Sequence, residues 1–264
     1  MIEAEVLGEA RRLALAWQNA IPVLPPTSRH EAFDRAAAYR VQDAVVELLA
    51  EDLGQRVGWK LGATSLSSTM EPFSGPLHAE MVVPSGGSIR LDRCIAPRVE
   101  VEVAIVLGED VSRPLTETDA AALDFGLAAA LEIIDDRTVG PTGDADRVAD
   151  VATMRWAVIG PARRADLADA SSWRASLIED GTQVAIGTLV ETINSPIESL
   201  IWLSRHLARR GGSLAGGDVI LTGSLTGQHP PRPGSRYEGR VSGLASVDVE
   251  FVPGEPGRLG SGSR

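Results

Sequence analysis

The spacing of hydrophobic positions along the chain changes near residue 55. Before that point, apolar residues recur at helical spacing among charged ones over residues 2–19. Three nearby prolines interrupt that helix. A second helix is expected to start at Thr27–Ser28, which can cap it, and to run to about Leu53, where Gly54 ends it. The pattern therefore predicts a small N-terminal helical cap over residues 1–54.

Beyond residue 54 the pattern becomes that of strands. Short runs rich in β-branched residues are separated by Gly and Pro. The clearest of these runs are residues 57–61, 99–107, 157–159, 219–222 and 247–252. Helices are expected among them at 117–125 and 196–210. We predict an α+β chain with a catalytic domain over 55–252, built on a mixed or antiparallel sheet or roll with helices outside. The Pro-, Gly- and Ser-rich residues 253–264 are expected to be a disordered tail.

The strongest helix signal in this second part follows residue 194. Ser195 suits the N-cap position, Pro196 the first helical position, and Glu198 the reciprocal position of a capping box. Gly211 and Gly212 then stop the helix. These residues predict a helix over 196–210 on the outside of the sheet.

Composition narrows the classes of protein that fit. The chain has 264 residues, 44% of them hydrophobic, which is enough for one large domain with its own core. Its net charge of −11 argues against nucleic acid and anionic membranes as partners. The single cysteine, Cys94, excludes an internal disulfide, and four histidines without an H-x-x-x-H pattern disfavour zinc. No stretch approaches about 18 consecutive apolar residues, so we expect a cytoplasmic protein.

Three glutamates stand where apolar residues would be expected. Glu100 and Glu102 lie in the run 99–104, and both point the same way because a strand turns successive side chains to opposite faces. Glu132 lies in a second apolar run, 127–134. Like charges on one buried face repel, and Mg²⁺ or Mn²⁺, which prefer oxygen ligands, would compensate. The alternative is that the first two line the solvent side of an edge strand.

A lysine also interrupts an apolar strand. Lys60 lies between Gly58 and Gly62, and glycines within a strand often mark the close approach of a ligand. A buried lysine near a metal can act as a general acid or base, and Glu80 is a candidate to orient it. The alternative is that the Lys60 side chain extends to solvent.

A Gly-rich loop follows the strand at 219–222. Backbone amides and hydroxyls of Thr222, Gly223 and Ser224 could hold a substrate carboxylate, although an ordinary turn is an equal alternative. Neither a phosphate loop nor a G-x-G-x-x-G motif is present, so no nucleotide site is indicated. His78 would lie at the mouth of the pocket or simply at the surface.

Taken together, these segments resemble the fumarylacetoacetate hydrolase superfamily, and within it the branch of 2-keto-4-pentenoate hydratases and 4-oxalocrotonate decarboxylases. The resemblance covers roughly residues 5–252 and rests on motifs that occur in the same order. They are Gly58-Trp59-Lys60-Leu61-Gly62, Gly75-Pro76-Leu77, Pro97-Arg98-Val99-Glu100-Val101-Glu102, Ala130-Leu131-Glu132-Ile133, Leu221-Thr222-Gly223 and Gly243-Leu244-Ala245-Ser246-Val247. The combination is fairly specific, whereas each motif alone is weak.

The resemblance implies a mixed β-roll with outer helices and a small N-terminal helical region. It implies a Mg²⁺ or Mn²⁺ ion held by three carboxylates, which match Glu100, Glu102 and Glu132. By the same resemblance, this ion chelates the 1-carboxylate and 2-oxo groups of a 2-oxoacid. It places Lys60 in the catalytic pocket. Members are commonly homo-oligomers, and decarboxylases and hydratases of this branch associate, so a pathway enzyme is a candidate partner.

One stretch departs from the branch. Its usual Ala-Asp-Asn-x-Ser reads Ala-Asp-Val-Ala-Thr over residues 149–153, with Val151 in place of asparagine. Valine cannot donate a hydrogen bond, so substrate or water must be positioned differently, and we include Thr153 among the substrate-binding residues. The loop over 226–231 also differs from the hydratase and decarboxylase forms.

The function that these observations favour is hydration of an unsaturated 2-oxoacid of the 2-hydroxypenta-2,4-dienoate type by a divalent-metal-dependent lyase. In this hypothesis Lys60 transfers a proton, Glu80 orients the Lys60 side chain, and residues 222–224 hold the substrate carboxylate. Decarboxylation of a vinylogous 2-oxoacid and acylpyruvate-type C–C hydrolysis stay open, although the His–Glu couple of the hydrolases is not evident upstream of the lysine. Outside the enzymes, Val151 motivates the alternative of a silent chain that only binds a 2-oxoacid or a partner enzyme.

Overall fold

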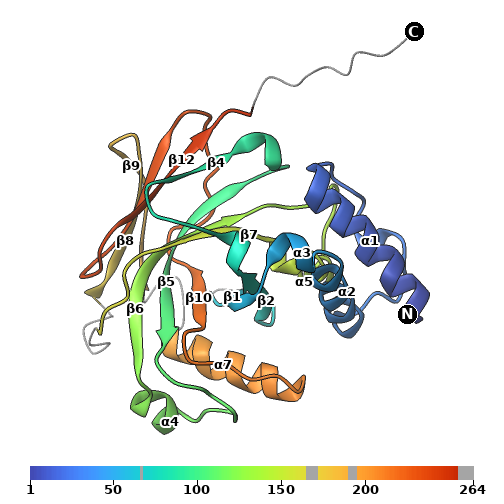
Figure 1. Ribbon diagram of the computed structural model, residues 1–264, viewed down its shortest axis with the longest axis horizontal. Helices are drawn as coiled ribbons and strands as arrows, with labels where there is room; N and C mark the ends of the chain where they lie inside the picture. The colour runs from blue at the N-terminus through green and yellow to red at the C-terminus, as the bar shows by residue number, and fades with distance from the viewer. Residues whose placement is uncertain (66–67, 165–171, 190–194, 255–264) are drawn as a thin grey trace.

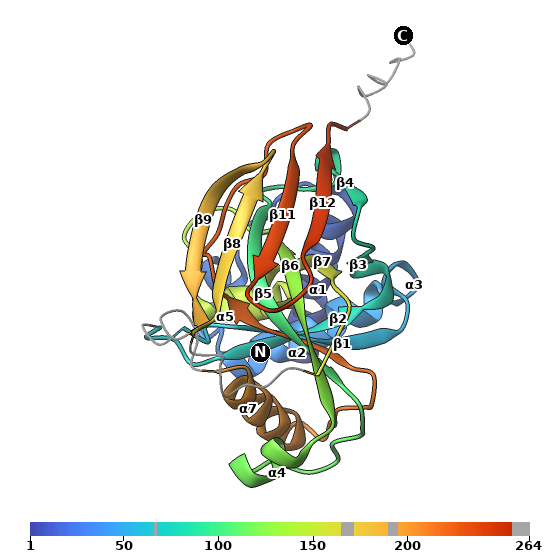
Figure 2. The same ribbon diagram turned by 90° about the vertical axis from the view of Figure 1, so that its left-hand side faces the viewer.

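Two β-sheets packed against each other form the body of the protein (Figures 1 and 2). The computed structural model describes residues 1–65, 68–164, 172–189 and 195–254. The larger sheet has seven strands, in the order β2 (Phe73–His78), β1 (Arg56–Gly62), β10 (Val219–Ser224), β5 (Arg98–Leu107), β6 (Phe125–Ile134), β7 (Met154–Ile159) and β3 (Val82–Val83). It is mixed, because β1 runs parallel to β10 and β3 parallel to β7, whereas its other pairs are antiparallel.

The second sheet has five strands. Their order is β4 (Gly87–Arg90), β12 (Val247–Val252), β11 (Arg236–Val241), β8 (Arg174–Glu179) and β9 (Thr182–Thr188). Only the pair of β12 with β4 is parallel. Figure 2 shows these strands in front of the central strands of the larger sheet.

Helices lie outside the sheets in two groups. Within the described residues, the α-helices are α1 (Glu3–Asn19), α2 (Arg35–Leu48), α3 (Ala50–Leu53), α4 (Glu117–Ala122), α5 (Asp144–Ala149) and α7 (Pro196–Arg209). Short 3₁₀ turns are η1 (Pro26–Ser28), η2 (Ala79–Met81), η3 (Leu91–Arg93) and η4 (Val151–Thr153). In Figure 1, α1, α2, α3 and α5 gather on one side of the molecule, and α4 and α7 lie below the sheets.

The central strands β5 and β6 are buried on both faces, which is why their sequence is almost continuously apolar. Val99, Val101 and Val103 face the five-stranded sheet and join its hydrophobic core. Ala104 and Ala130 belong to a second core, which α1, α2 and α5 cover. Side chains that alternate with the valines of β5 therefore point toward the helices.

These features confirm the predicted α+β architecture, a mixed β-roll with outer helices and a small N-terminal helical region. The division after residue 54 stays a prediction, since α1 and α2 share their core with α5 and β2. Of the predicted tail, residues 255–264 lie outside the described residues.

Helix boundaries follow the local capping chemistry. The Oγ of Ser195 accepts a hydrogen bond from the backbone N–H of Glu198, and Pro196 occupies the first turn, as predicted for α7. The second helix was placed wrongly at Thr27–Ser28, which form a 3₁₀ turn. It begins after Asp34, whose carboxylate accepts from the N–H of Ala37. The helix expected over 117–125 ends at Ala122, because β6 starts at Phe125.

Candidate metal centre

Glu100, Glu102 and Glu132 lie together on the helix-facing side of the larger sheet. Glu100 is paired directly with Glu132 across β5 and β6, and Glu102 with Ala130. All three are buried, with exposed fractions of 7%, 0% and 1%. One carboxylate oxygen of each lies within 4.8 Å of the others. The alternative that Glu100 and Glu102 line a solvated edge strand is therefore wrong, because β5 is a central strand.

The electrostatics of this cluster are unfavourable for the protein alone. Burial, followed by the charge of Glu132, raises the pKa of Glu100 to about 7. Burial and the two neighbouring carboxylates raise the pKa of Glu102 well above its ordinary range. Within the described residues, Oε1 of Glu102 has no hydrogen-bond donor. A hard divalent cation fits this all-oxygen donor set, because it would neutralise the carboxylates and take the unpaired oxygen as a ligand.

Lys60 on β1 joins the same cluster. Its Nζ lies 3.1 Å from Oε1 of Glu132 and donates a hydrogen bond of 3.0 Å to the carbonyl of Ala152. The side chain is 4% exposed, so the alternative that it extends to solvent is wrong. An ammonium has three N–H donors, and Lys60 lines the cavity beside the carboxylates, so one donor remains for a ligand.

Lys60 is also the only lysine in the sequence, against 24 arginines. The one lysine stands beside the carboxylates, and a lysine, unlike an arginine, can lose a proton. Arginine stays protonated in proteins and cannot take part in such an exchange. This compositional signal supports proton transfer as the task of Lys60.

The carbonyl that holds Lys60 comes from a strained turn. Val151, Ala152 and Thr153 all have positive φ values, of 49°, 53° and 58°. β-Branched residues rarely adopt this conformation, so the surrounding structure must enforce it. The position expected to be asparagine, Val151, is 1% exposed and packs in the helix-side core rather than facing a ligand.

A buried ion pair fixes the start of that turn. The guanidinium of Arg137 donates to Oδ1 of Asp150 at 2.6 Å and to the carbonyl of Met154 at 2.9 Å, and the Arg137 backbone N–H donates to Oδ2 of Asp150. Arg137 is 1% exposed. Asp135 and Arg137 are therefore both buried, and of these three consecutive residues only Asp136 is exposed.

Gly75 on β2 packs against the strained turn at residues 151–153, where the absence of a side chain leaves the space that the turn occupies. A Cβ at this position would lie 2.7 Å from Cβ of Ala152 and 2.8 Å from the carbonyl oxygen of Val151. Because these neighbours are backbone or backbone-fixed atoms, they cannot move aside cheaply. We expect Gly75→Ala to destabilise the protein by about 1–3 kcal/mol, measured from the midpoint of denaturant unfolding.

Gly8→Ala is the matched control for that change. Gly8 lies on the exposed face of α1, and a Cβ there meets nothing within 4 Å. Alanine in a helix should stabilise by up to about 1 kcal/mol. Equal unfolding midpoints for Gly75→Ala and the parent chain would contradict the close packing of the turn.

The end of β10 supplies further groups. The N–H of Gly223 donates to Oε2 of Glu102 at 2.9 Å, and the polar side chains of Ser224 and Gln228 favour the charged form of Glu100, which lowers its pKa against the effect of burial. Gly223, Ser224 and Thr153 line the cavity, as their predicted substrate-binding role requires. Thr222 does not line it. Its hydroxyl is buried and donates to the carbonyl of Val103, so a direct contact of its side chain with substrate is not supported.

Glu80 lies elsewhere. It is exposed on η2 and lines a separate hollow with Trp17, Asp52 and Arg155. Its predicted pairing with Lys60 is wrong, because Glu132 takes that position. His78 lies neither at the pocket mouth nor at the surface. It is buried, and its Nδ1 lies 2.8 Å from the carbonyl oxygen of Gly54.

The carboxylates and Lys60 line a cavity of about 190 Å³ between β1, β5, β6 and the strained turn. Lining residues that the sequence patterns did not predict include Met70, Asp136, Arg147 and Gln228. Each stands in a loop or short helix, where no periodic pattern marks the inward side. The place of Gln228 in the same cavity as Glu100 depends on how the loop after β10 folds back, which the sequence does not reveal.

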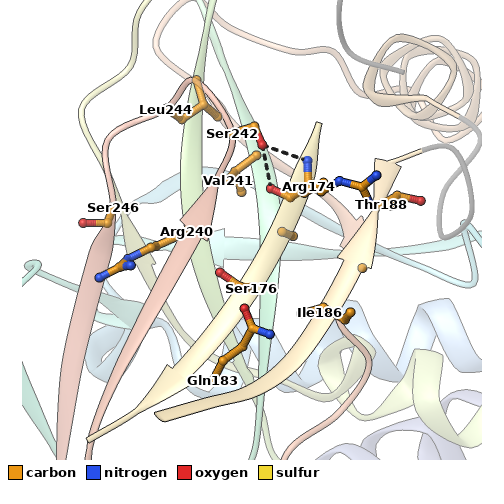
Figure 3. A pocket seen from close by; sticks show the side chains of 12 residues that line it. Arg174, Ser176, Gln183, Ile186, Thr188, Arg240, Val241, Ser242, Leu244 and Ser246 are labelled. Carbon is orange, nitrogen blue, oxygen red and sulfur yellow. Dashed lines mark hydrogen bonds between the residues drawn. The ribbon is translucent and has the colours of Figure 1, made fainter. Parts of the chain in front are cut away.

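A larger hollow of about 620 Å³ lies on the five-stranded sheet (Figure 3). Side chains from β8, β9 and the end of β11 surround it, and Ser242 exchanges hydrogen bonds with the backbone of Arg174. Its lining includes Arg174 and Arg240 but no carboxylate or lysine. The arrangement offers no group for proton transfer or metal binding, so we place the chemistry in the smaller cavity.

None of the helices within the described ranges has the length and apolar character needed to cross a membrane.

The sequence of this chain is similar to those of several known proteins. Residues 61–252 match the family described as "Fumarylacetoacetate (FAA) hydrolase C-terminal". The "TodF product hydratase" of Pseudomonas putida is 32% identical over 259 residues, covering 94% of each chain. "2-keto-4-pentenoate hydratase 1" of Dechloromonas aromatica is 30% identical, covering 92% of this chain and 95% of its own. A 4-oxalocrotonate decarboxylase from a Pseudomonas species is also 30% identical, covering 84% and 89%.

Solved structures of similar proteins have the same fold as this chain. The 4-oxalocrotonate decarboxylase of Pseudomonas putida G7, complexed with magnesium and adipate, superposes with a TM-score of 0.88 at 27% identity, covering 96% of this chain and 99% of that one. A second structure of that enzyme, with calcium and acetate, gives a TM-score of 0.86 at 28% identity and covers the same shares. The fumarylpyruvate hydrolase of Pseudomonas aeruginosa, at 20% identity and a TM-score of 0.58, shares the fold alone.

Proposed function

This chain belongs to the fumarylacetoacetate hydrolase family, and we propose that it is a divalent-metal-dependent hydratase of an unsaturated 2-oxoacid of the 2-hydroxypenta-2,4-dienoate type. The observation that carries the proposal is the convergence of three buried carboxylates with Lys60 in one cavity. Relatives named as hydratases, about 30% identical over more than nine tenths of the chain, support it.

Glu100, Glu102 and Glu132 would hold the cation. Magnesium and calcium in the structures of the similar decarboxylase support a divalent ion, and the oxygen-only donor set favours Mg²⁺ or Mn²⁺. When bound, the cation supplies Lewis acidity toward the 2-oxo group of the substrate. The N–H of Gly223 fixes the orientation of Glu102, and the polar side chains of Ser224 and Gln228 would stabilise the charged form of Glu100 that binds the cation.

Lys60 would perform the proton transfer. Hydration adds a proton to one carbon of the substrate double bond and the hydroxyl of water to the other. The Ala152 carbonyl and Glu132 hold the Lys60 ammonium in place, so its remaining N–H can be delivered to the substrate, and the amine can then recover a proton from the attacking water.

Thr153 is the residue that we propose in place of the asparagine expected at position 151. Within the described part of the chain, no hydrogen bond of its side chain to another residue is found, and it lines the cavity next to the strained turn. Its hydroxyl can donate to a substrate oxygen or to the attacking water, which Val151 cannot do.

Decarboxylation is the second candidate. The 30% identical decarboxylase and the structural match to the Pseudomonas putida G7 enzyme favour it, and adipate in that structure is a dicarboxylate. Loss of CO₂ from a vinylogous 2-oxoacid needs the same Lewis acid and a proton donor for the product. The three carboxylates and Lys60 can therefore serve either reaction, and the substrate must distinguish them.

Metal removal tests the proposed function. Purified protein with Mg²⁺ is expected to consume 2-hydroxypenta-2,4-dienoate, followed by its ultraviolet absorbance, with formation of a 4-hydroxy-2-oxoacid. Complete chelation should reduce turnover by at least about 10³-fold, and added Mn²⁺ should restore it. Turnover that survives chelation would refute the metal role. Absence of turnover with both this substrate and 2-oxohex-3-enedioate would favour a silent binding chain.

A further inference from the structure

A second positive group lines the metal cavity. Arg147, on α5, is half-buried, and its side chain forms part of the wall with Met70 and Asp136. The proposed reaction at the carboxylates and Lys60 does not use it. An arginine in a cavity this small lowers the stability of the protein, because its guanidinium is partly desolvated, unless a bound ligand compensates its charge.

The guanidinium of Arg147 has weak protein partners. Its Nη1 donates to the thioether sulfur of Met70 at 3.7 Å, and a thioether is a poor acceptor. Across the described ranges, no ion pair joins Arg147 to any carboxylate, including Asp136. Arg137, only ten residues earlier, shows the contrast, since its guanidinium is fully engaged by Asp150 and the Met154 carbonyl.

Arg147 lies toward the outer part of the cavity. Glu102 and Glu132 are buried at 0% and 1% exposure, whereas Asp136 is exposed and Arg147 half-buried. A ligand held at the carboxylates by its 1-carboxylate and 2-oxo groups would extend toward this end. A planar guanidinium with free donors there is suited to a carboxylate, which it can bind in a bidentate manner.

Charge balance agrees with this placement. Four carboxylates line the cavity, those of Glu100, Glu102, Glu132 and Asp136. A divalent cation and Lys60 would leave one negative charge, and Arg147 brings the lining to neutrality. Without Arg147, a second anionic group on the substrate would meet a net negative wall, and Asp136 would repel it directly.

We propose that Arg147 binds a second, distal carboxylate of the substrate, so that this cavity selects dicarboxylic over monocarboxylic 2-oxoacids. The inference rests on the proposed function, because it requires the 2-oxoacid head to be held at the three glutamates. It makes Arg147 a specificity-determining residue for either hydration or decarboxylation. The preferred substrate is then a linear unsaturated 2-oxoacid with a carboxylate at its far end. 2-Hydroxypenta-2,4-dienoate, which has the same head group and no distal carboxylate, is a poorer substrate of the same site.

Two saturated ligands of equal length test this assignment without turnover. 2-Oxoadipate and 2-oxohexanoate share the 2-oxoacid head and differ in a terminal carboxylate or methyl group. Calorimetric titration of the Mg²⁺-loaded protein is expected to show at least about tenfold tighter binding of 2-oxoadipate, the effect of one hydrogen-bonded ion pair. Arg147→Met should reduce this preference to about twofold or less, and Arg147→Lys should keep part of it.

Arg209→Met is the matched control. Arg209 is exposed on α7 and does not line the cavity, so its loss removes one positive charge without changing either affinity. The thermal midpoint of each variant reports whether the fold is intact. Equal affinities of the parent protein for the two ligands, or an unchanged preference in a folded Arg147→Met variant, would overturn the inference. Failure of both ligands to bind would instead reject the 2-oxoacid site itself, and this inference with it.

Discussion

Glu102→Gln is expected to reduce kcat/KM by at least about 10³-fold, because it removes one of three oxygen ligands and the charge that holds the cation. Glu102 is fully buried and has one oxygen without a hydrogen-bond donor in the described structure. Its other oxygen accepts from Gly223, and an amide oxygen can keep that contact. The geometry of β5 and β10 should therefore survive the change.

The same variant should be at least as stable as the parent protein when no metal is present. Burial and the two neighbouring carboxylates raise the pKa of Glu102, so folding without metal carries the cost of holding this carboxyl in its unfavourable surroundings, and an uncharged amide avoids that cost. Added Mg²⁺ should then raise the thermal midpoint of the parent but not of the variant. A destabilised Glu102→Gln variant whose midpoint still rises with Mg²⁺ would contradict the assignment. Glu80→Gln serves as the matched control, since Glu80 lines another hollow and should be silent in both assays.

Lys60→Arg and Lys60→Met are both expected to lose about 10²–10⁴-fold in kcat, the usual contribution of a positioned acid or base. Arginine keeps a positive charge beside Glu132 but cannot release a proton. The pair of variants therefore separates charge from proton transfer. Substantial activity in Lys60→Arg would mean that Lys60 acts only as a counter-charge, and proton transfer would have to be assigned elsewhere.

Because the chain has a single lysine, its side chain can be observed directly. Protein labelled with ¹⁵N only at lysine Nζ should give one side-chain resonance, whose titration reports the protonation of Lys60. Binding of Mg²⁺ and of a 2-oxoacid analogue should each shift that resonance if Nζ lies beside the cation and the ligand. A resonance that responds to neither would exclude Lys60 from the reacting centre.

Local sequence patterns revealed the parts of the site that lie on strands. Glutamates at alternate positions of an apolar run share one face, so Glu100 and Glu102 could be paired from the sequence. Glu132 could be added as the third ligand because it also lies in an apolar run. Alternation cannot by itself distinguish a buried face from a solvated one. The order of strands, which places β5 and β6 at the centre of the sheet, decides the matter.

Residues outside the strands could not be placed in this way. Glu80 follows β2 in a 3₁₀ turn that directs it away from Lys60, and no periodicity predicts that direction. The ion pair between Arg137 and Asp150 is local in sequence, yet its burial depends on the helices packed over it. Thr222 carries a hydroxyl at the predicted position, but the carbonyl of Val103 already accepts its proton.

The most direct test of this account is a crystal structure of the protein soaked with Mn²⁺ and recorded at a wavelength where manganese scatters anomalously. The account predicts one strong anomalous peak within about 2.0–2.3 Å of an oxygen from each of Glu100, Glu102 and Glu132. A peak at any other position, or none at these three carboxylates at saturating Mn²⁺, would contradict it.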